Sequence, residues 1–527
     1  MPRRFNTTGD CRAEWHYMIP PLPRLPEAIG LIEQMNYFVV HAPRQTGKTT
    51  TLIALAKSLT ESGKYAALHF SCEEGRAAGD DYGGAQRAIL HEMMERARGL
   101  LPMELQPPPL LLESDESLIR NNLSNWARLC PKPLVLFFDE IDSLQGQSLL
   151  SVLSQLRAGF SSRPDNFPAS IILCGLRDVR DYKAASGGDP NRLASSSPFN
   201  VKVKSLKLGN FTRAEVEQLY AQHSAETGQA FTPDALARAY ESTGGQPWLV
   251  NALAREIVEE MALPVSETIR AEHVDEAKER LILARATHLD SLVAKLMEPR
   301  VKRILQPIVA GTMEGDGDFS YDEDLSYCRD LGLIAPNNPM RIANPIYREV
   351  IVRVLSSSAE SKVLAEPKSF VLPDGKLDMR RMLDEFADFW REHGDVLANG
   401  MSYHEAAPQL VIMAFLQRIV NGGGVIDREY GIGRGRIDLL VRWPFKDEQG
   451  RRCVQREALE LKVWKDKQKD PLEKGLKQLD EYLGKVGLDT GVLVLFDRRS
   501  GAEDIETRTR FDEATTPSGK KIKLLRA

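Results

Sequence analysis

Short runs of consecutive apolar residues recur along the first 210 residues, separated by amphipathic segments. Four of these runs have the length and composition of buried strands, and a fifth alternates apolar with polar residues as an edge strand does. They lie at residues 37–41, 66–72, 134–138, 170–175 and 201–208. Because helical segments separate the strands, we predict an α/β domain with a parallel sheet and helical crossovers.

The pattern becomes helical after residue 210, and Thr212 and Thr232 stand where N-caps are expected. Further on, a helix at 324–331 is followed by a turn and an apolar segment at 340–343, an order that suggests a winged helix. The last part of the chain again alternates helices and strands. We therefore divide the chain into an ATPase-like domain (1–210), a helical lid (211–295), a winged helix (296–357), a linker (358–380) and a C-terminal α/β domain (381–527).

Composition narrows the class of protein. The 527 residues are 42% hydrophobic and 27% charged, as in an ordinary globular protein of several domains. No apolar run approaches the roughly 18–20 residues that cross a bilayer, and no secretion signal is recognisable at the start. The six cysteines form no Cys-x-x-Cys pair, which argues against a zinc site and fits a reducing cytoplasm. A net charge of −5 gives no attraction of the whole chain to nucleic acid.

A glycine-containing loop between a strand and a helix is the strongest chemical signal. It reads Ala42-Pro43-Arg44-Gln45-Thr46-Gly47-Lys48-Thr49, followed by Thr50. Such a loop directs backbone N–H groups and a helix N-terminus at phosphate. We expect Lys48 to neutralise the phosphates and Thr49 to ligate Mg²⁺. Ala42 stands where the pattern has glycine, so the shape of the loop at that position is open.

A second signal is a pair of acids directly after the apolar run at 134–138. Asp139 and Glu140 would lie at the carboxyl edge of the sheet, beside the phosphate loop. Asp139 would hold Mg²⁺, and Glu140 would orient the attacking water. An Asp-Glu helix cap explains the position of these acids, but not the presence of both signals in one chain.

The order of these strands resembles the AAA+ and STAND divisions of P-loop ATPases. Arg177 follows the strand at 170–175, where the resemblance implies a sensor of the γ-phosphate; pairing with Asp178 is the alternative. Arg157 and Arg163 are candidates for an arginine finger that acts on a neighbouring subunit, which would make the chain a homo-oligomer.

The resemblance extends to Gly244-Gly245-Gln246-Pro247. In STAND-type ATPases such a segment follows the nucleotide domain, and its proline packs close to the adenine; an ordinary helix start is the alternative. The segments 5–18 and 37–50 also look like those of a bacterial family of AAA-like ATP-binding proteins. This resemblance implies ATP as ligand, with residues 16–24 lying against the base.

Carboxylates on two predicted strands mark the C-terminal domain. Asp438 lies in one strand, and Glu460 and Lys462 share one face of the next. Two such acids can hold Mg²⁺ through oxygen ligands, and the lysine can position a water. The layout resembles the PD-(D/E)xK nuclease superfamily. Two accessory features, Glu405 in the preceding helix and Gln478-x-x-x-Tyr482 in the following one, agree with it.

Each element of this C-terminal pattern also has an ordinary explanation. Glu-x-Lys is common in exposed strands, and the lysines between 462 and 469 alternate with acids as a solvated face would. We therefore carry two hypotheses. The first is an ATPase that controls a Mg²⁺-dependent DNA nuclease, in defence or DNA processing. The second is a STAND-like switch whose C-terminal domain binds nucleic acid or protein without cutting.

Overall fold

The computed structural model describes residues 2–112, 114–176, 201–284, 287–309, 322–336, 340–360, 370–400, 407–420, 425–429, 438–447 and 449–527. The chain forms two compact units. The first comprises Met1–Ala284 with Asp330–Gly332, and the second comprises Arg285–Arg329 with Leu333–Ala527. The finer division into five parts stays a prediction.

A five-stranded sheet forms the centre of the first unit, in the order β2-β3-β4-β1-β5. All neighbouring strands are parallel, as predicted, and β5 lies at an edge. The strands are β1 (Tyr37–His41), β2 (Ala66–Ser71), β3 (Leu134–Asp139), β4 (Ser170–Gly175) and β5 (Lys202–Lys207). Because β1 and β3 both end at the same edge, the phosphate loop and the acid pair are brought together.

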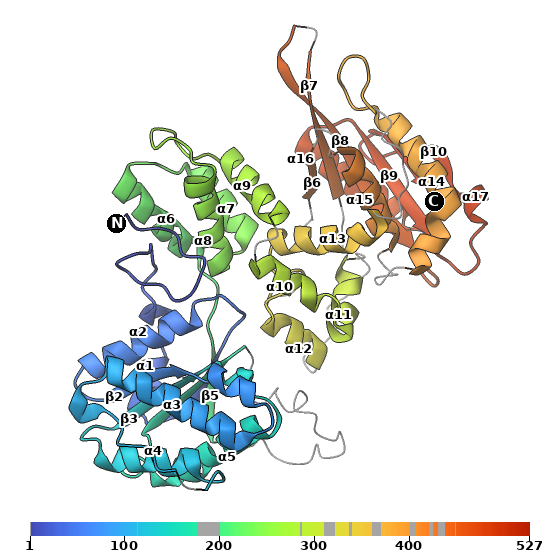
Figure 1. Ribbon diagram of the computed structural model, residues 1–527. Coiled ribbons are helices and arrows are strands. Elements are labelled where there is room, and N and C mark those ends of the chain that lie inside the picture. The colour runs from blue at the N-terminus through green and yellow to red at the C-terminus, as the bar shows by residue number, and fades with distance from the viewer. Residues whose placement is uncertain are drawn as a thin grey trace. The chain divides into compact units, whose positions relative to one another are not determined.

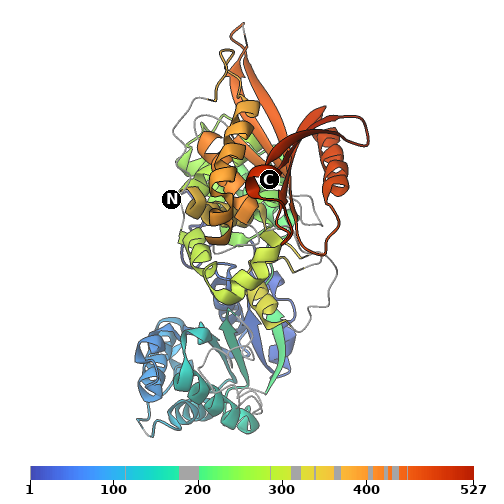
Figure 2. The same cartoon turned by 90° about the vertical axis from the view of Figure 1, so that its right-hand side faces the viewer.

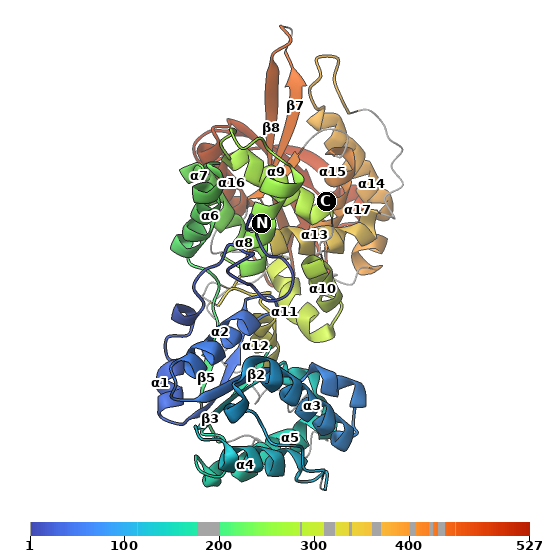
Figure 3. The same cartoon turned by 60° about the vertical axis from the view of Figure 1, so that its left-hand side comes forward.

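Helices cover both faces of this sheet (Figure 3). Alternate residues of the strands contact α1 (Ala28–Glu33) and α2 (Lys48–Glu61) on one face. The residues between them contact α3 (Tyr82–Leu100), α4 (Leu118–Leu129) and α5 (Gly146–Gly159) on the other. Short 3₁₀ turns join these elements at Leu22–Arg24, Glu73–Ala78, Met103–Leu105, Ile141–Ser143 and Phe160–Ser162.

The helical lid follows as α6 (Arg213–Thr227), α7 (Pro233–Thr243), α8 (Pro247–Arg255), a π-helical turn (Glu256–Glu260) and α9 (Ala271–Leu283). Both predicted N-caps are confirmed. The Thr212 hydroxyl accepts from the Glu215 N–H at 3.2 Å, and Thr232 caps α7 in the same way through Ala235. The N-terminal segment joins the lid, since Phe5 and Tyr17 lie in ring contact with each other and with His223.

The second unit begins with α10 (Thr287–Lys295), α11 (Pro299–Val309), α12 (Glu323–Asp330) and α13 (Pro345–Glu360). The predicted helix and hairpin are present, because α12 is followed by an antiparallel bridge between Ile334 and Ile342. Helical residues lie at both ends of the predicted linker. Helix α13 runs to Glu360, since its Ser and Ala residues tolerate helix, and α14 (Met379–Gly400) begins before residue 380.

A six-stranded mixed sheet completes the second unit, in the order β10-β11-β9-β8-β7-β6 (Figure 1). Its strands are β6 (Val425–Glu429), β7 (Asp438–Lys446), β8 (Arg452–Trp464), β9 (Thr490–Asp497), β10 (Arg510–Thr515) and β11 (Lys521–Arg526). The first three form an antiparallel meander, and β9 runs parallel to β8.

One face of this sheet is covered by α14 and α15 (Ala407–Val420), where Trp390 of α14 contacts Phe496 of β9. The other face is covered by α16 (Leu472–Val486), whose apolar residues pack on β8, β9 and β11; Figure 2 shows helices on both sides. A short α17 (Ile505–Arg508) precedes β10. This α/β arrangement agrees with the alternation of elements seen in the sequence, although that pattern does not predict β10 and β11.

Candidate functional site

The loop between β1 and α2, where we predict phosphate binding, includes residues with a left-handed backbone. Its left-handed residues are Gln45, with φ +57°, and Gly47, with φ +89°. Ala42, the departure from the glycine pattern, is fully buried and is not among the residues with positive φ. The methyl group of an alanine is tolerated at ordinary negative φ, so this substitution leaves the loop intact.

Lys48 is held close to its own loop. Its Nζ donates to the carbonyl oxygens of Ala42 at 2.8 Å and Pro43 at 2.9 Å. The Thr46 hydroxyl donates to the same Pro43 oxygen at 2.9 Å. The ammonium group of Lys48 therefore lies over the loop, where it could contact a bound phosphate.

One carboxylate oxygen links the phosphate loop to the acid pair. Asp139 Oδ2 accepts a hydrogen bond from the Thr49 hydroxyl at 2.7 Å and lies 3.0 Å from His69 Nε2. Burial alone would raise the pKa of Asp139, but the hydrogen bonds and charge of His69, together with the Thr49 hydroxyl, lower it to about 2. Asp139 is thus ionised, and its oxygen and the Thr49 hydroxyl form a donor pair of the kind that Mg²⁺ prefers.

Glu140 lies beside Asp139 in a left-handed conformation, with φ +54°. Its backbone N–H donates to Asp139 Oδ1 at 2.9 Å, and its carboxylate accepts from the Ser71 hydroxyl at 2.8 Å. Partial burial raises the pKa of this carboxyl, and the nearby Glu73 acts in the same direction. The Glu140 side chain is exposed, so water can reach it.

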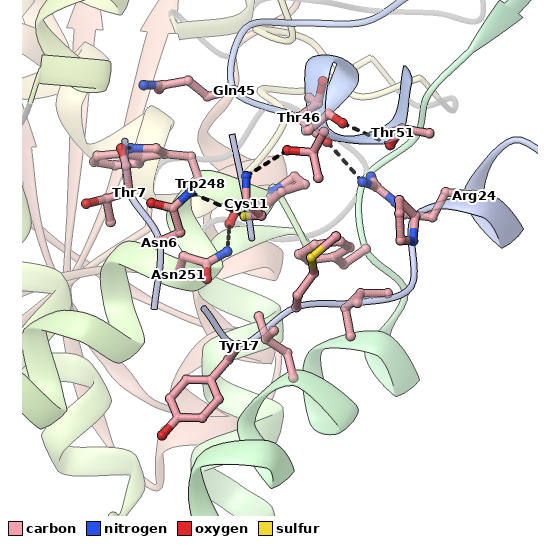
Figure 4. A pocket seen from close by; sticks show the side chains of 18 of the residues that line it. Asn6, Thr7, Cys11, Tyr17, Arg24, Gln45, Thr46, Thr51, Trp248 and Asn251 are labelled. Carbon is pink, nitrogen blue, oxygen red and sulfur yellow. Dashed lines mark hydrogen bonds between the residues drawn. The ribbon is translucent and has the colours of Figure 1, made fainter. Parts of the chain in front are cut away.

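A pocket adjoins the phosphate loop, with an empty volume of about 660 Å³ that includes the space at its mouth. Three parts of the first unit line it: the N-terminal segment, the loop with the start of α2, and the lid (Figure 4). Its lining residues are Asn6, Thr7, Thr8, Gly9, Cys11, Tyr17, Met18, Ile19, Pro21, Arg24, Gln45, Thr46, Gly47, Thr50, Thr51, Phe211, Leu219, Pro247, Trp248 and Asn251.

The Gly-Gly-Gln-Pro turn forms the lid side of this pocket. A Cβ on Gly245, which has φ +69°, would lie 2.0 Å from the Phe211 carbonyl oxygen, so only glycine fits. Gln246 caps α8 by accepting from the Leu249 N–H, and its side-chain amide also donates to the Gln45 carbonyl at 3.4 Å. The turn therefore connects the lid directly to the phosphate loop, and Pro247 opens α8.

Two pocket residues that the sequence analysis did not identify form hydrogen bonds between the segments that line the pocket. Trp248 donates its indole N–H to the Thr7 carbonyl at 2.9 Å. Arg24 donates to the Thr46 carbonyl at 3.1 Å and to the Gly209 carbonyl at 2.7 Å, and its guanidinium lies over the Phe211 ring. His69 was missed in the same way, because its partner Asp139 lies 70 residues away in the sequence.

The two candidate arginine fingers differ in their surroundings. Arg163 lies over the rings of Tyr37 and Phe160 and donates to the Phe160 carbonyl at 2.7 Å. Arg157 is exposed on α5. Arg177 lies outside the described residues, so its role as a sensor stays a prediction.

The second candidate site lies on the C-terminal sheet. In the antiparallel register Asp438 is directly opposite Glu460, and Glu429 of β6 is directly opposite Asp438. Residues that face each other in this way belong to the same face of a sheet. Three acidic positions thus form a row across three strands. Glu429 was not predicted, although it alternates with Asp427 along β6.

Glu460 and Lys462 lie on the face covered by α16. Glu460 has no exposed surface, and the Lys462 ammonium forms an ion pair with its carboxylate. Gly475 of α16 allows this helix to approach the sheet closely, since a Cβ there would lie 3.0 Å from Leu493 Cδ1 of β9. Gln478 and Tyr482 are both buried on the same helix. The structure therefore brings four of the predicted residues to one side of the sheet.

Glu405 and the side chains of Glu429 and Asp438 lie outside the described residues. Among the side chains that the structure describes, no group of three His, Cys, Asp or Glu residues has the geometry of a metal site. The row of acids is therefore defined by the pairing of strand positions. Within the described part of the chain, no helix is long and apolar enough to cross a membrane.

Comparison with solved structures gives matches that cover about two thirds of the chain. A Walker-type ATPase of Pyrococcus abyssi is 15% identical, with 66% of this chain and 99% of that chain covered and a TM-score of 0.45. The RuvB Holliday junction branch migration motor of Thermotoga maritima is 14% identical, with 62% and 92% covered and a TM-score of 0.34. Cdc6p of Pyrobaculum aerophilum is 14% identical, with 64% and 93% covered and a TM-score of 0.35.

No protein-family model matches the chain, and no curated protein sequence matches it. Since the TM-scores of the solved structures are below 0.5, the P-loop NTPase fold of the first unit rests on its own geometry. That geometry is a parallel sheet in the order β2-β3-β4-β1-β5, with the phosphate loop after β1 and the acid pair after β3.

Proposed function

We propose that the first unit binds and hydrolyses ATP with Mg²⁺, and that this reaction controls a Mg²⁺-dependent DNA nuclease in the C-terminal domain. The observation that carries the first half is the hydrogen bond between Thr49 and Asp139 at the mouth of the phosphate loop. A helix start and a strand end meet there through the two oxygen ligands that a Mg²⁺–nucleotide complex requires.

The phosphate loop and the acid pair of the first unit have separate roles in this proposal. The loop N–H groups and the α2 N-terminus bind the phosphates, and Lys48 leaves the carbonyls of Ala42 and Pro43 to contact the phosphate oxygens. Thr49 and Asp139 would hold Mg²⁺, which when bound neutralises phosphate charge. Glu140 orients the attacking water from its exposed position.

The neighbouring pocket suits the nucleoside. Its walls combine aromatic and apolar surface from Trp248, Phe211 and Ile19 with hydroxyl groups from Thr50 and Thr51. A lining that combines apolar and aromatic surface with a few polar groups is typical of small-molecule sites. Pro247 and the segment that ends at Arg24 both line it, which supports the positions that the AAA-like resemblance implies for the base.

The second half of the proposal rests on the opposition of Asp438 and Glu460 in the strand register. The two acidic positions would hold Mg²⁺, and Lys462 would steady the scissile phosphate or a water beside them. Water attacks phosphorus, the P–O bond to one sugar breaks, and the products are a phosphate monoester and a free hydroxyl. Gln478 and Tyr482 would support the site from α16.

Plasmid cleavage with Mg²⁺ tests the proposal, with and without ATP. We expect the wild-type protein to cut and Glu460→Gln and Lys462→Ala to lose cleavage by about 100-fold or more, because several kcal/mol of transition-state stabilisation is removed. Glu473→Gln, an exposed acid on α16, is the matched control and should cut normally. Loss of ATP control in Lys48→Ala would show the coupling.

Two outcomes would contradict this assignment. Cleavage that is equal in wild type and Glu460→Gln would place the activity elsewhere. Absence of cleavage on plasmid, linear and single-stranded DNA, in a protein that binds ATP, would favour the second hypothesis, a nucleotide-dependent switch whose C-terminal domain binds without cutting.

A further inference from the structure

The ribbon formed by β7 and β8 extends beyond the rest of the C-terminal sheet (Figures 1 and 3). The partner β6 pairs with β7 only as far as Arg442, and β9 pairs with β8 only from Leu459 onward. Residues 443–446 and 452–455 therefore pair only with each other, and Arg442 and Arg456 form the next pair at the base of this ribbon. This part of the molecule is a two-stranded ribbon.

The two faces of the ribbon differ in character. One face packs against residues 370–377: Trp443 donates to the Gly375 carbonyl at 3.0 Å, and Gln455 donates to the Leu377 carbonyl at 3.0 Å. Because strand residues alternate between faces, the other face carries Arg442, Pro444 and Lys446 from β7, with Arg452, Val454 and Arg456 from β8. All of these except Arg442, which is half-buried, are exposed.

Like charges face each other across this exposed face. Arg442 is directly opposite Arg456, and Lys446 is directly opposite Arg452. Directly opposed like charges destabilise an antiparallel pair. Within the described part of the chain, Lys446, Arg452 and Arg456 form no ion pair with an acid. Their neighbour Arg451, in the turn, does pair with Asp447 at 2.8 Å.

This basic face continues into the candidate nuclease site. The positions of β8 that alternate with Arg452 and Arg456 lead on to Ala458, Glu460 and Lys462. On β7 the same alternation leads from Lys446 and Arg442 to Asp438. Successive positions on one face lie about 7 Å apart, so the basic residues form a stripe that points toward the row of acids, with the buried Leu440 and Ala458 between the two.

We propose that this basic stripe, made of Arg442, Lys446, Arg452 and Arg456, binds the phosphate backbone of duplex DNA and directs it to the C-terminal acids. The inference rests on the proposed nuclease function. The folding cost of the opposed like charges is relieved when a polyanion lies between them. A two-stranded ribbon fits the major groove of B-DNA, whereas the major groove of A-form RNA is too narrow to admit one.

Binding of a short fluorescent DNA duplex to the full chain, with Ca²⁺ in place of Mg²⁺ to suppress cleavage, tests the stripe. In the triple variant Lys446→Ala, Arg452→Ala, Arg456→Ala we expect the Kd to rise about tenfold or more and the salt slope to fall by about 2–3, since each lost phosphate contact removes about 0.9. The control triple variant Lys64→Ala, Arg98→Ala, Arg128→Ala removes the same charge from exposed positions of the first unit and should bind as wild type.

Thermal stability separates this role from a structural one. Arg452→Thr removes one of the two opposed positive charges of the Lys446/Arg452 pair, so we expect its Tm to rise while its affinity for DNA falls. A residue that only supported the fold would lower both. Equal binding by the two triple variants, or tighter binding to an RNA duplex of the same length, would overturn the proposal.

The stripe and the nuclease site can fail independently. Normal cleavage by Glu460→Gln, combined with weak DNA binding by the stripe variant, would refute the nuclease assignment and uphold the stripe. Loss of cleavage in Glu460→Gln, combined with normal binding and cleavage by the stripe variant, would refute the stripe alone.

Discussion

Two buried residues show how the surroundings of a side chain determine its protonation state. In the first unit, Asp139 is almost completely buried but ionised, because His69 and Thr49 both direct polar groups at one of its oxygens. In the second unit, His288 of α10 is 8% exposed, and its Nε2 is within hydrogen-bond distance of the Tyr347 hydroxyl of α13. Hydrogen-bond partners keep the buried carboxylate charged in the first case, against the effect of burial, whereas burial keeps the imidazole neutral in the second.

The histidine gives a pH prediction. Burial lowers the pKa of His288 to about 4. Since an unfolded histidine titrates near 6.5, the unfolded state binds the extra proton between pH 6.5 and 4. Stability is therefore complete above pH 6.5 and falls as the pH is lowered, by up to roughly 3 kcal/mol near pH 4. Urea unfolding at a series of pH values measures this slope.

A glutamine at this position should flatten that slope. His288→Gln keeps a polar side chain but cannot take up the proton, so the free energy of unfolding of the second unit should depend less on pH. His393→Gln is the control, because that ring is about half exposed (48%). The same slope in wild type and His288→Gln would contradict the assigned cause.

At the scale of elements, the turn that precedes α8 determines the position of the lid side of the pocket. Gly245 combines φ +69° with a backbone oxygen 2.0 Å from where a Cβ would be. This position fixes the start of α8, and with it Pro247 and Trp248 in the pocket. The turn is thus the element that sets the distance between the lid and the phosphate loop.

Gly245→Ala should therefore lower the stability of the first unit by roughly 1–3 kcal/mol and weaken nucleotide binding with it. Gly99→Ala is the matched control: that glycine lies in α3 with no atom within 4 Å of a new Cβ, so the change should be neutral or slightly stabilising. Thermal unfolding of the two variants checks the difference, and equal stability would contradict the steric argument.

Periodicity was sufficient to predict the regular elements. The five strands of the first sheet, the caps at Thr212 and Thr232, and the order of helices and strands in the C-terminal domain all follow from local patterns. The edge hairpin of β10 and β11 did not, because the mixed charges of residues 510–526 hide its alternation. The bounds of the linker stay a prediction, because Ser- and Ala-rich sequence is compatible with both coil and helix.

The residues of the candidate sites also fall into two groups, those that the sequence predicts and those that it does not. Lys48, Thr49, Asp139 and Gly245 could be predicted because the roles expected of them depend on local spacing. His69, Trp248 and Glu429 were missed because each acquires its partner only through strand pairing or lid packing. The two groups differ in how far each residue lies from its partner along the sequence, and not in the chemistry of their side chains.

At the scale of the whole molecule, average charge conceals local charge. The chain carries a net −5, which gives no reason to expect contact with a polyanion. The β7–β8 ribbon nevertheless carries four basic residues on one face, opposed in two like-charged pairs. Each compact unit has its own candidate site, so an ATPase and a nuclease can be tested separately in one protein.

The central claim is that the phosphate loop binds a Mg²⁺–ATP complex, and equilibrium binding of a fluorescent ATP analogue to the full chain tests it most directly. We predict saturable, Mg²⁺-dependent binding by the wild type and by Lys57→Ala, a control on the exposed side of the same helix (72% exposed). Lys48→Ala should bind at least about tenfold more weakly, because a charge-assisted contact of about 1.5–3 kcal/mol is lost. Equal affinity in Lys48→Ala and wild type, or no binding by either, would contradict the account.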